Sequence, residues 1–245
     1  MSVLADTTYA GWGATSDKEG VRGYISQDDA DNYVSINASW IGLCSTGCAA
    51  LVPVNGYTKH AEWVQQGVIQ GSNWAGTGAS PTHVRFYYEN WNPCNEYFAL
   101  ADAAAPSSPY FFQIKYAGTS LTLHHCGDGF PYYAYNFNYR RGSSTVPFFG
   151  GALQTTDGRA DANTEVHENQ PFGNAWFGCK AAYTCDNDNY GIEVNGGSGW
   201  NLCCSTPRAI GPVDVAHEPG SQNPYRFTYN LAWSFKNCSV AASCT

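Results

Sequence analysis

The segment Trp63-Val64-Gln65-Gln66-Gly67-Val68-Ile69 is rich in aromatic and β-branched residues, which predicts a β-strand. Side chains alternate between the two faces of a strand, so Trp63, Gln65 and Gly67 would share one face. Two glutamines in so apolar a strand are unusual, because a buried amide must be hydrogen-bonded or face a cavity. Gly67 would remove bulk beside Gln65 and let a substrate backbone approach the amide. A polar outer face of an edge strand is the alternative.

Similar short strands recur along the chain, separated by turns rich in Gly, Ser, Asn, Asp and Pro. No window of a dozen residues repeats apolar side chains with a helical period. We therefore expect an all-β antiparallel sandwich or jelly roll, as one domain over residues 1–245. Loops are expected at 1–20, as an N-terminal extension, and at 205–225. The expected strands are 22–26, 33–41, 63–69, 83–88, 132–139, 163–167, 190–194 and 224–235, with a hairpin of 110–116 and 120–125 around Ala117-Gly118-Thr119.

Charge and cysteine content exclude several classes of protein. The 245 residues carry 12 Lys and Arg against 20 Asp and Glu, a net charge of -8, so no nucleic-acid partner is expected. No apolar run approaches the roughly 18–20 residues that span a bilayer, so no membrane association is expected. The ten cysteines lack the C-x2-C spacing of zinc sites, and we expect up to five disulfides in a secreted protein. The first residues lack the pattern of a signal peptide, which favours a mature secreted form, and we expect a monomer.

Several catalytic motifs are missing from the chain. The six histidines form no H-E-x-x-H, and no G-x-S-x-G, P-loop or dinucleotide fingerprint is present. Serine hydrolases, zinc hydrolases and nucleotide-dependent enzymes are therefore disfavoured. We expect no metal and no cofactor.

Two further segments carry polar or aromatic side chains on one face. In residues 161–168, alternation would put Asp161, Asn163, Glu165 and His167 on one face, either lining a wet cleft or facing bulk solvent. In residues 85–93 the same alternation would put one carboxylate among aromatic side chains, and such a face suits a groove that binds a peptide or a sugar chain. The residues on that second face are Arg85, Tyr87, Glu89 and Trp91.

In their order along the chain, these segments resemble the fungal glutamic peptidases (eqolisins). Ala38-Ser39-Trp40-Ile41-Gly42 resembles their A-W-V-G strand, and Val64-Gln65-Gln66-Gly67-Val68 resembles the L-Q-T-G-V segment that carries their catalytic glutamine. Tyr87-Tyr88-Glu89-Asn90-Trp91-Asn92-Pro93 resembles their Y-E-W-Y-P. Asn163-Thr164-Glu165-Val166-His167-Glu168 is similar to N-A-E-W-I-V-E, in which the first glutamate is catalytic.

A second likeness is to the neprosin-like peptidases. Gly20-Val21-Arg22-Gly23-Tyr24-Ile25 resembles their G-A-R-A-x-I strand, and Trp63 to Val68 resembles the strand with their first catalytic glutamate. This chain has Gln65 at that position, which fits the glutamine–glutamate dyad of the eqolisins better.

The resemblance implies a concanavalin-like jelly roll and an acid-acting endopeptidase. Glu165 would take a proton from a water that attacks the scissile carbonyl, and the Gln65 amide would stabilise the oxyanion. A general base with a carboxyl pKa near about 4 to 5 implies an acidic optimum. The polypeptide substrate would be contacted by Trp40, Trp63, Tyr87, Glu89 and Trp91.

Three other possibilities stay open from the sequence. Eight Trp and 17 Tyr could stack on sugar rings in a non-catalytic, lectin-like protein. A glycan-active enzyme could pair Glu89 with Glu165 or Glu193, because glycoside hydrolases need two carboxylates about 5 to 9.5 Å apart. A structural, disulfide-stabilised protein without activity is the third possibility.

Overall fold

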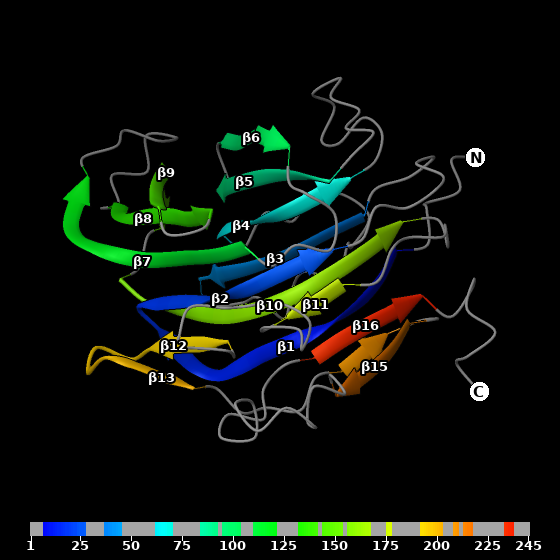
Figure 1. The fold of residues 1–245 in the computed structure, drawn as a ribbon. Helices are drawn as coiled ribbons and strands as arrows, with labels where there is room; N and C mark the ends of the chain where they lie inside the picture. Colours follow the sequence, from blue (N-terminus) through cyan, green and yellow to red (C-terminus); the bar gives the residue numbers. More distant parts are fainter. Residues whose placement is uncertain are drawn as a thin grey trace, which may run out of the picture.

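The described part of the chain is built from strands and contains no helix in this computed structural model. Every strand pairing is antiparallel, and the strands form two sheets (Figure 1). An all-β, two-sheet sandwich is therefore confirmed. The described residues are 7–27, 37–45, 62–70, 84–92, 95–103, 110–121, 132–141, 144–153, 156–167, 175–177, 192–202, 208–210, 213–217 and 233–237.

One sheet has seven strands in the order β14-β1-β10-β3-β4-β5-β6. In Figure 1, β6, β5, β4, β3, β10 and β1 follow one another from top to bottom. Its strands are β1 (Thr7–Lys18), β3 (Asn37–Cys44), β4 (Trp63–Gln70), β5 (Arg85–Asn92), β6 (Asn95–Ala103), β10 (Gly158–His167) and β14 (Arg208–Ile210).

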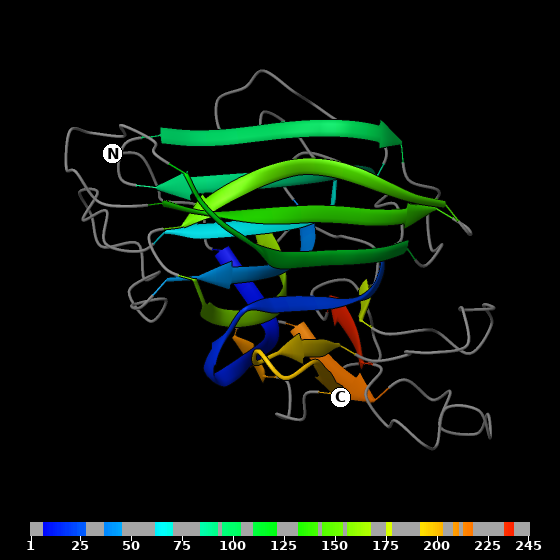
Figure 2. The same cartoon turned by 90° about the vertical axis from the view of Figure 1, so that its left-hand side faces the viewer.

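The other sheet has nine strands, with β15-β16-β11-β2-β7-β8-β9 in order and the β12–β13 hairpin joined to β2. In Figure 2 the long strands of both sheets run in similar directions, as in aligned sheet packing. Its strands are β2 (Gly20–Gln27), β7 (Tyr110–Leu121), β8 (Tyr132–Arg141), β9 (Ser144–Leu153), β11 (Ala175–Phe177), β12 (Glu193–Asn195), β13 (Trp200–Leu202), β15 (Val213–His217) and β16 (Trp233–Asn237).

The core between the sheets is formed by every second side chain along the strands, on the face of each sheet that points toward the other sheet. Val64 and Val68 of β4 enter it and are at most 1 % exposed, as do residues of β5, β7 and β8. Phe86 crosses from β5 to meet Tyr110 and Phe112 of β7 edge-on, with ring centroids 4.7 and 5.9 Å apart. Edge-to-face contacts add to the free energy of apolar burial. This packing fixes which face of the seven-stranded sheet points away from the core.

Three expectations about strands are corrected. Residues 7–18 form β1, a long strand between β10 and β14, and not a loop; pairing on both sides fixes it. Ala117-Gly118-Thr119 is not a hairpin turn: β7 is continuous over 110–121, and its register with β8 shifts between Tyr116 and Ser120. Gly118 has φ 78°, so a bulge takes up the extra residues. β14 and β15 lie inside the expected loop 205–225.

Gln66 is a buried amide that joins the two sheets. Its side chain has no exposed surface, and Nε2 donates to the backbone oxygens of Gln113 (2.6 Å) and Asn138 (3.1 Å) in the opposite sheet. The β8–β9 register is irregular next to Asn138, where Pro147 lies opposite and has no N–H to donate. One of the two unusual glutamines of β4 is therefore a structural donor inside the core.

We expect Gln66→Leu to lower the free energy of unfolding by about 2–4 kcal/mol, because two buried carbonyls lose their donor. Urea unfolding followed by tryptophan fluorescence measures the loss. Gln113→Leu is the matched control, since the Gln113 side chain is partly exposed and should cost little. Equal unfolding midpoints for the two variants would contradict this role of Gln66.

Candidate functional site

The candidate site lies on the face of the seven-stranded sheet that points away from the core, here called the outer face. Val64, Ile41, Leu43, Ala160 and Ala162 are core residues, so the positions between them face outward. Outward positions therefore include Gln65 on β4, Gly42 on β3 and Asp161 on β10.

The register brings four of these positions into one row across the sheet. Gln65 pairs with Glu89 of β5 on one side and with Gly42 of β3 on the other. Gly42 in turn pairs with Asp161 of β10. Directly paired residues are the closest neighbours on one face of a sheet. The Gln65 amide therefore lies between two carboxylates, one on each side.

Glu89 fixes the Gln65 side chain through a short hydrogen bond. Gln65 Nε2 donates to Glu89 Oε2 at 2.6 Å, and Trp63 Nε1 donates to Glu89 Oε1 at 3.1 Å. Glu89 is only 3 % exposed. Hydrogen bonds to an ionised acceptor are shorter and stronger than neutral ones, so this carboxylate holds both donors in place.

On the other side of Gln65, the Asp161 carboxylate occupies the space above Gly42. A Cβ built on Gly42 would lie 2.5 Å from Asp161 Oδ1 and 3.4 Å from Gln65 Cβ. The missing side chain of Gly42 thus leaves room for the Asp161 carboxylate to reach toward β4. Neither Gly42 nor Asp161 is among the residues that the sequence predicts for the site. The shared alternation of Asp161 and Glu165 along one strand is the signal that could have found Asp161.

Exposure separates the residues of the outer face into two groups. Trp63, Gln65 and Asp161 are partly exposed. Tyr87 has no exposed surface and Trp40 is 6 % exposed, so both, like Glu89, lie beneath the accessible surface. Their burial favours a role in supporting the site over direct contact with a substrate. The side chain of Trp91, which pairs with Trp63, lies outside the described residues.

Glu165, the expected partner of Gln65, is not brought into the same row. It pairs with Ala38 of β3 and Tyr9 of β1, four residues beyond Asp161 along β10. The Cα of Glu165 therefore lies about 13 Å farther along β10 than the Cα of Asp161. Both residues are two strand spacings, about 10 Å, away from β4. Of the expected dyad, the structure therefore describes the Gln65 environment and places the backbone of Glu165 in another row.

Gly67 has a different role from the expected one. A Cβ there would clash with the backbone oxygen of Ser39 and come 2.7 Å from Trp40 Cα. The glycine therefore allows β3 and β4 to approach each other, and does not open space for a substrate.

Of the carboxylate pairs considered for a glycan-active enzyme, Glu89 and Glu193 lie on different sheets. Glu193 lies on β12, which pairs with β2 of the nine-stranded sheet, and it forms an ion pair with Arg22 at 2.5 Å. Arg22 also lies over the ring of Trp200, 4.4 Å from its centroid. Ile192 and Val194 belong to the core, so Glu193 faces away from it on the other sheet. Glu89 and Glu193 cannot act on one glycosidic bond.

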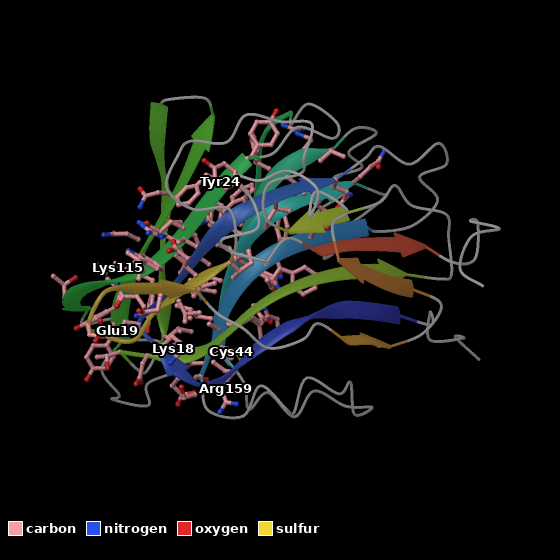
Figure 3. All side chains as sticks on the ribbon, turned by 60° about the horizontal axis from the view of Figure 1, so that its bottom comes forward. Lys18, Glu19, Tyr24, Cys44, Lys115 and Arg159 are labelled. Carbon is pink, nitrogen blue, oxygen red and sulfur yellow. The ribbon has the colours of Figure 1, made fainter. Side chains whose placement is uncertain are left out.

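The candidate site lies near one end of the sandwich. Cys44 and Arg159 pair across β3 and β10, two residues from Gly42 and Asp161. Figure 3 shows both toward the end where Lys18, Glu19 and Lys115 gather. Among the described residues, no group of three His, Cys, Asp or Glu side chains is placed to hold a metal ion. Nor does any described helix have the length and apolar character to cross a membrane.

Comparison with known proteins gives a likeness at the level of the structure. A scytalido-glutamic peptidase, solved with a peptide-based transition-state analog, matches with a TM-score of 0.51 and 8 % sequence identity. The match covers 95 % of this chain and 99 % of that one. At this identity the likeness shows the fold alone. No family model and no curated protein matches the sequence.

Proposed function

We propose that this chain is a secreted endopeptidase that hydrolyses peptide bonds in acid. In this proposal Gln65 stabilises the oxyanion, and a carboxylate of β10 activates the attacking water. The observation that carries it is the partly exposed Gln65 amide, held at 2.6 Å by the buried carboxylate of Glu89. The fold shared with a glutamic peptidase supports the same reaction class.

The fixed amide supplies what an oxyanion site requires. Nε2 has two hydrogens, and one of them is used by Glu89. Among the described residues that is the only hydrogen bond of the Gln65 side chain, so the second N–H is available to a ligand. A donor that is already oriented stabilises the developing negative charge without the cost of reorganisation.

The acidic working range follows from the use of a carboxylate base. The base must be ionised to accept the proton of water, and its ordinary pKa is about 4. The same group must then carry that proton to the leaving amine. Secretion and disulfide formation belong to the proposal too, since nine of the ten cysteines lie outside the described residues.

The proposal is tested by incubating the protein with a reduced, alkylated and denatured polypeptide at about pH 4 and about pH 7. We expect internal cleavage at the lower pH, seen as new peptides by mass spectrometry, and no inhibition by pepstatin. Binding to a glycan array without any cleavage would overturn the proposal and favour the lectin-like alternative.

A further inference from the structure

The geometry points to Asp161, and not Glu165, as the carboxylate that works with Gln65 to activate water. This inference rests on the proposed function. It also assigns a second element of the site, Gly42, as the residue that makes room for that carboxylate.

The first argument is register. Asp161, Gly42, Gln65 and Glu89 are consecutive partners across β10, β3, β4 and β5. Glu165 belongs to the row of Ala38 and Ile69. Register in a buried sheet is strongly specified, because every slip would turn core side chains outward. Asp161 is thus the β10 carboxylate in the row of the amide.

The second argument is the space over Gly42. Any side chain at this position would collide with Asp161 Oδ1, which lies 2.5 Å from the position of an added Cβ. The same Cβ would be in ordinary contact with Gln65 Cβ, at 3.4 Å. The carboxylate therefore leans over β3 toward β4, and both it and Gln65 are partly exposed to solvent.

The third argument is the orientation of the Gln65 amide. An ionised carboxylate only accepts hydrogen bonds, so the group facing Glu89 must be the NH2 of Gln65. Because the amide is planar, its Oε1 lies on the other side of Cδ from the NH2 group and does not face Glu89. A water between β3 and the substrate can donate one hydrogen to Gln65 Oε1 and one to Asp161, which leaves an oxygen lone pair for attack.

The reaction then balances within this site. Asp161 takes a proton from the water while the water oxygen bonds to the carbonyl carbon. The carbonyl oxygen becomes an oxyanion, which accepts a hydrogen bond from the second N–H of Gln65. The C–N bond breaks as the proton passes from Asp161 to the leaving nitrogen. The products are a carboxylic acid and an amine, and no oxidant or further reactant is consumed.

Four variants test the assignment, with hydrolysis of an unfolded polypeptide at about pH 4 as the first readout. We expect Asp161→Asn to lower kcat by at least about 10³-fold, in the range of a lost acid–base group, with KM little changed. Asp161→Glu should recover part of that loss. Gly42→Ala should lower kcat too, because the added methyl displaces the carboxylate. Glu165→Gln should stay within about threefold of the unmodified protein, well short of the loss of an acid–base group.

A second readout does not require activity. The side-chain NH2 signals of Gln65, assigned by NMR through their loss in Gln65→Ala, should shift as the two carboxylates in its row, Glu89 and Asp161, titrate between about pH 3 and pH 6. The part of that shift due to Asp161 should disappear in Asp161→Asn and persist in Glu165→Gln. The urea unfolding midpoint of each variant is measured alongside, so that a loss of stability is distinguished from a loss of activity or of the NMR shift.

The outcomes separate this inference from the proposed function. Cleavage that survives Asp161→Asn but is abolished by Glu165→Gln would overturn the inference and leave the endopeptidase standing. An unmodified protein that does not cleave would overturn the function, and with it the role of Asp161 as a base. The NMR titration would then still decide the geometry: an Asp161-dependent shift supports the pairing with Gln65, and an unchanged shift overturns it.

Discussion

Gln65→Ala is expected to lower kcat/KM for an unfolded polypeptide in acid by about 10²–10³-fold, the usual cost of removing one oxyanion donor. The loss should fall mainly on kcat, because the oxyanion exists only in the transition state and its intermediate. Steady-state kinetics with a fluorogenic peptide, selected from the cleavage products of the unmodified protein, measures both constants.

The fold of this variant must be checked, because Gln65 Nε2 is also a donor to a buried carboxylate. Of the two donors to Glu89, Gln65 Nε2 and Trp63 Nε1, the substitution removes the first. This loss should lower the free energy of unfolding by about 1–3 kcal/mol. Gln113→Ala removes the same side chain from β7 of the other sheet, where it is partly exposed, and should leave kcat/KM unchanged. A folded Gln65→Ala variant with full activity would overturn the role of the amide.

What could be predicted from the sequence is what depends on local alternation. The strand at 63–69 and the shared face of Trp63 and Gln65 follow from a two-residue period and from aromatic and β-branched composition. The sandwich class follows in the same way, since many short strands with turns between them have few other ways to bury a face. These features need no knowledge of which strand pairs with which.

What could not be predicted is what depends on pairing. The two carboxylates of β10, Asp161 and Glu165, both fit an alternating outward pattern, so alternation does not tell which of them shares a row with Gln65. Only the register with β3 distinguishes them, and register is set by the whole core and not by the strand itself. The Gly67 role was missed for the same reason, because a clash with Ser39 exists only once β3 lies beside β4.

The second large effect concerns stability. We expect Gly67→Ala to destabilise the protein by at least about 3 kcal/mol, toward or beyond the upper end of overpacking costs. The added Cβ would meet the backbone of Ser39 and Trp40, and backbone in the middle of a sheet cannot rotate away as a side chain can. β3 and β4 would have to separate, which weakens hydrogen bonds at a central pairing of the seven-stranded sheet. Since domains are stable by only about 5–15 kcal/mol, a lower soluble yield is expected as well.

Gly13→Ala is the matched control for this substitution. Gly13 lies on β1 of the same sheet, is exposed, and has nothing within 4 Å of an added Cβ. It should change the free energy of unfolding by less than about 1 kcal/mol, and in the stabilising direction if anything, because alanine restricts the unfolded chain. Circular dichroism and urea unfolding on both variants give the comparison. If Gly67→Ala unfolds at the same urea concentration as Gly13→Ala, the close approach of β3 and β4 is not required. The row that joins Asp161, Gly42, Gln65 and Glu89 would then lose its structural basis, because its geometry depends on the spacing of these two strands.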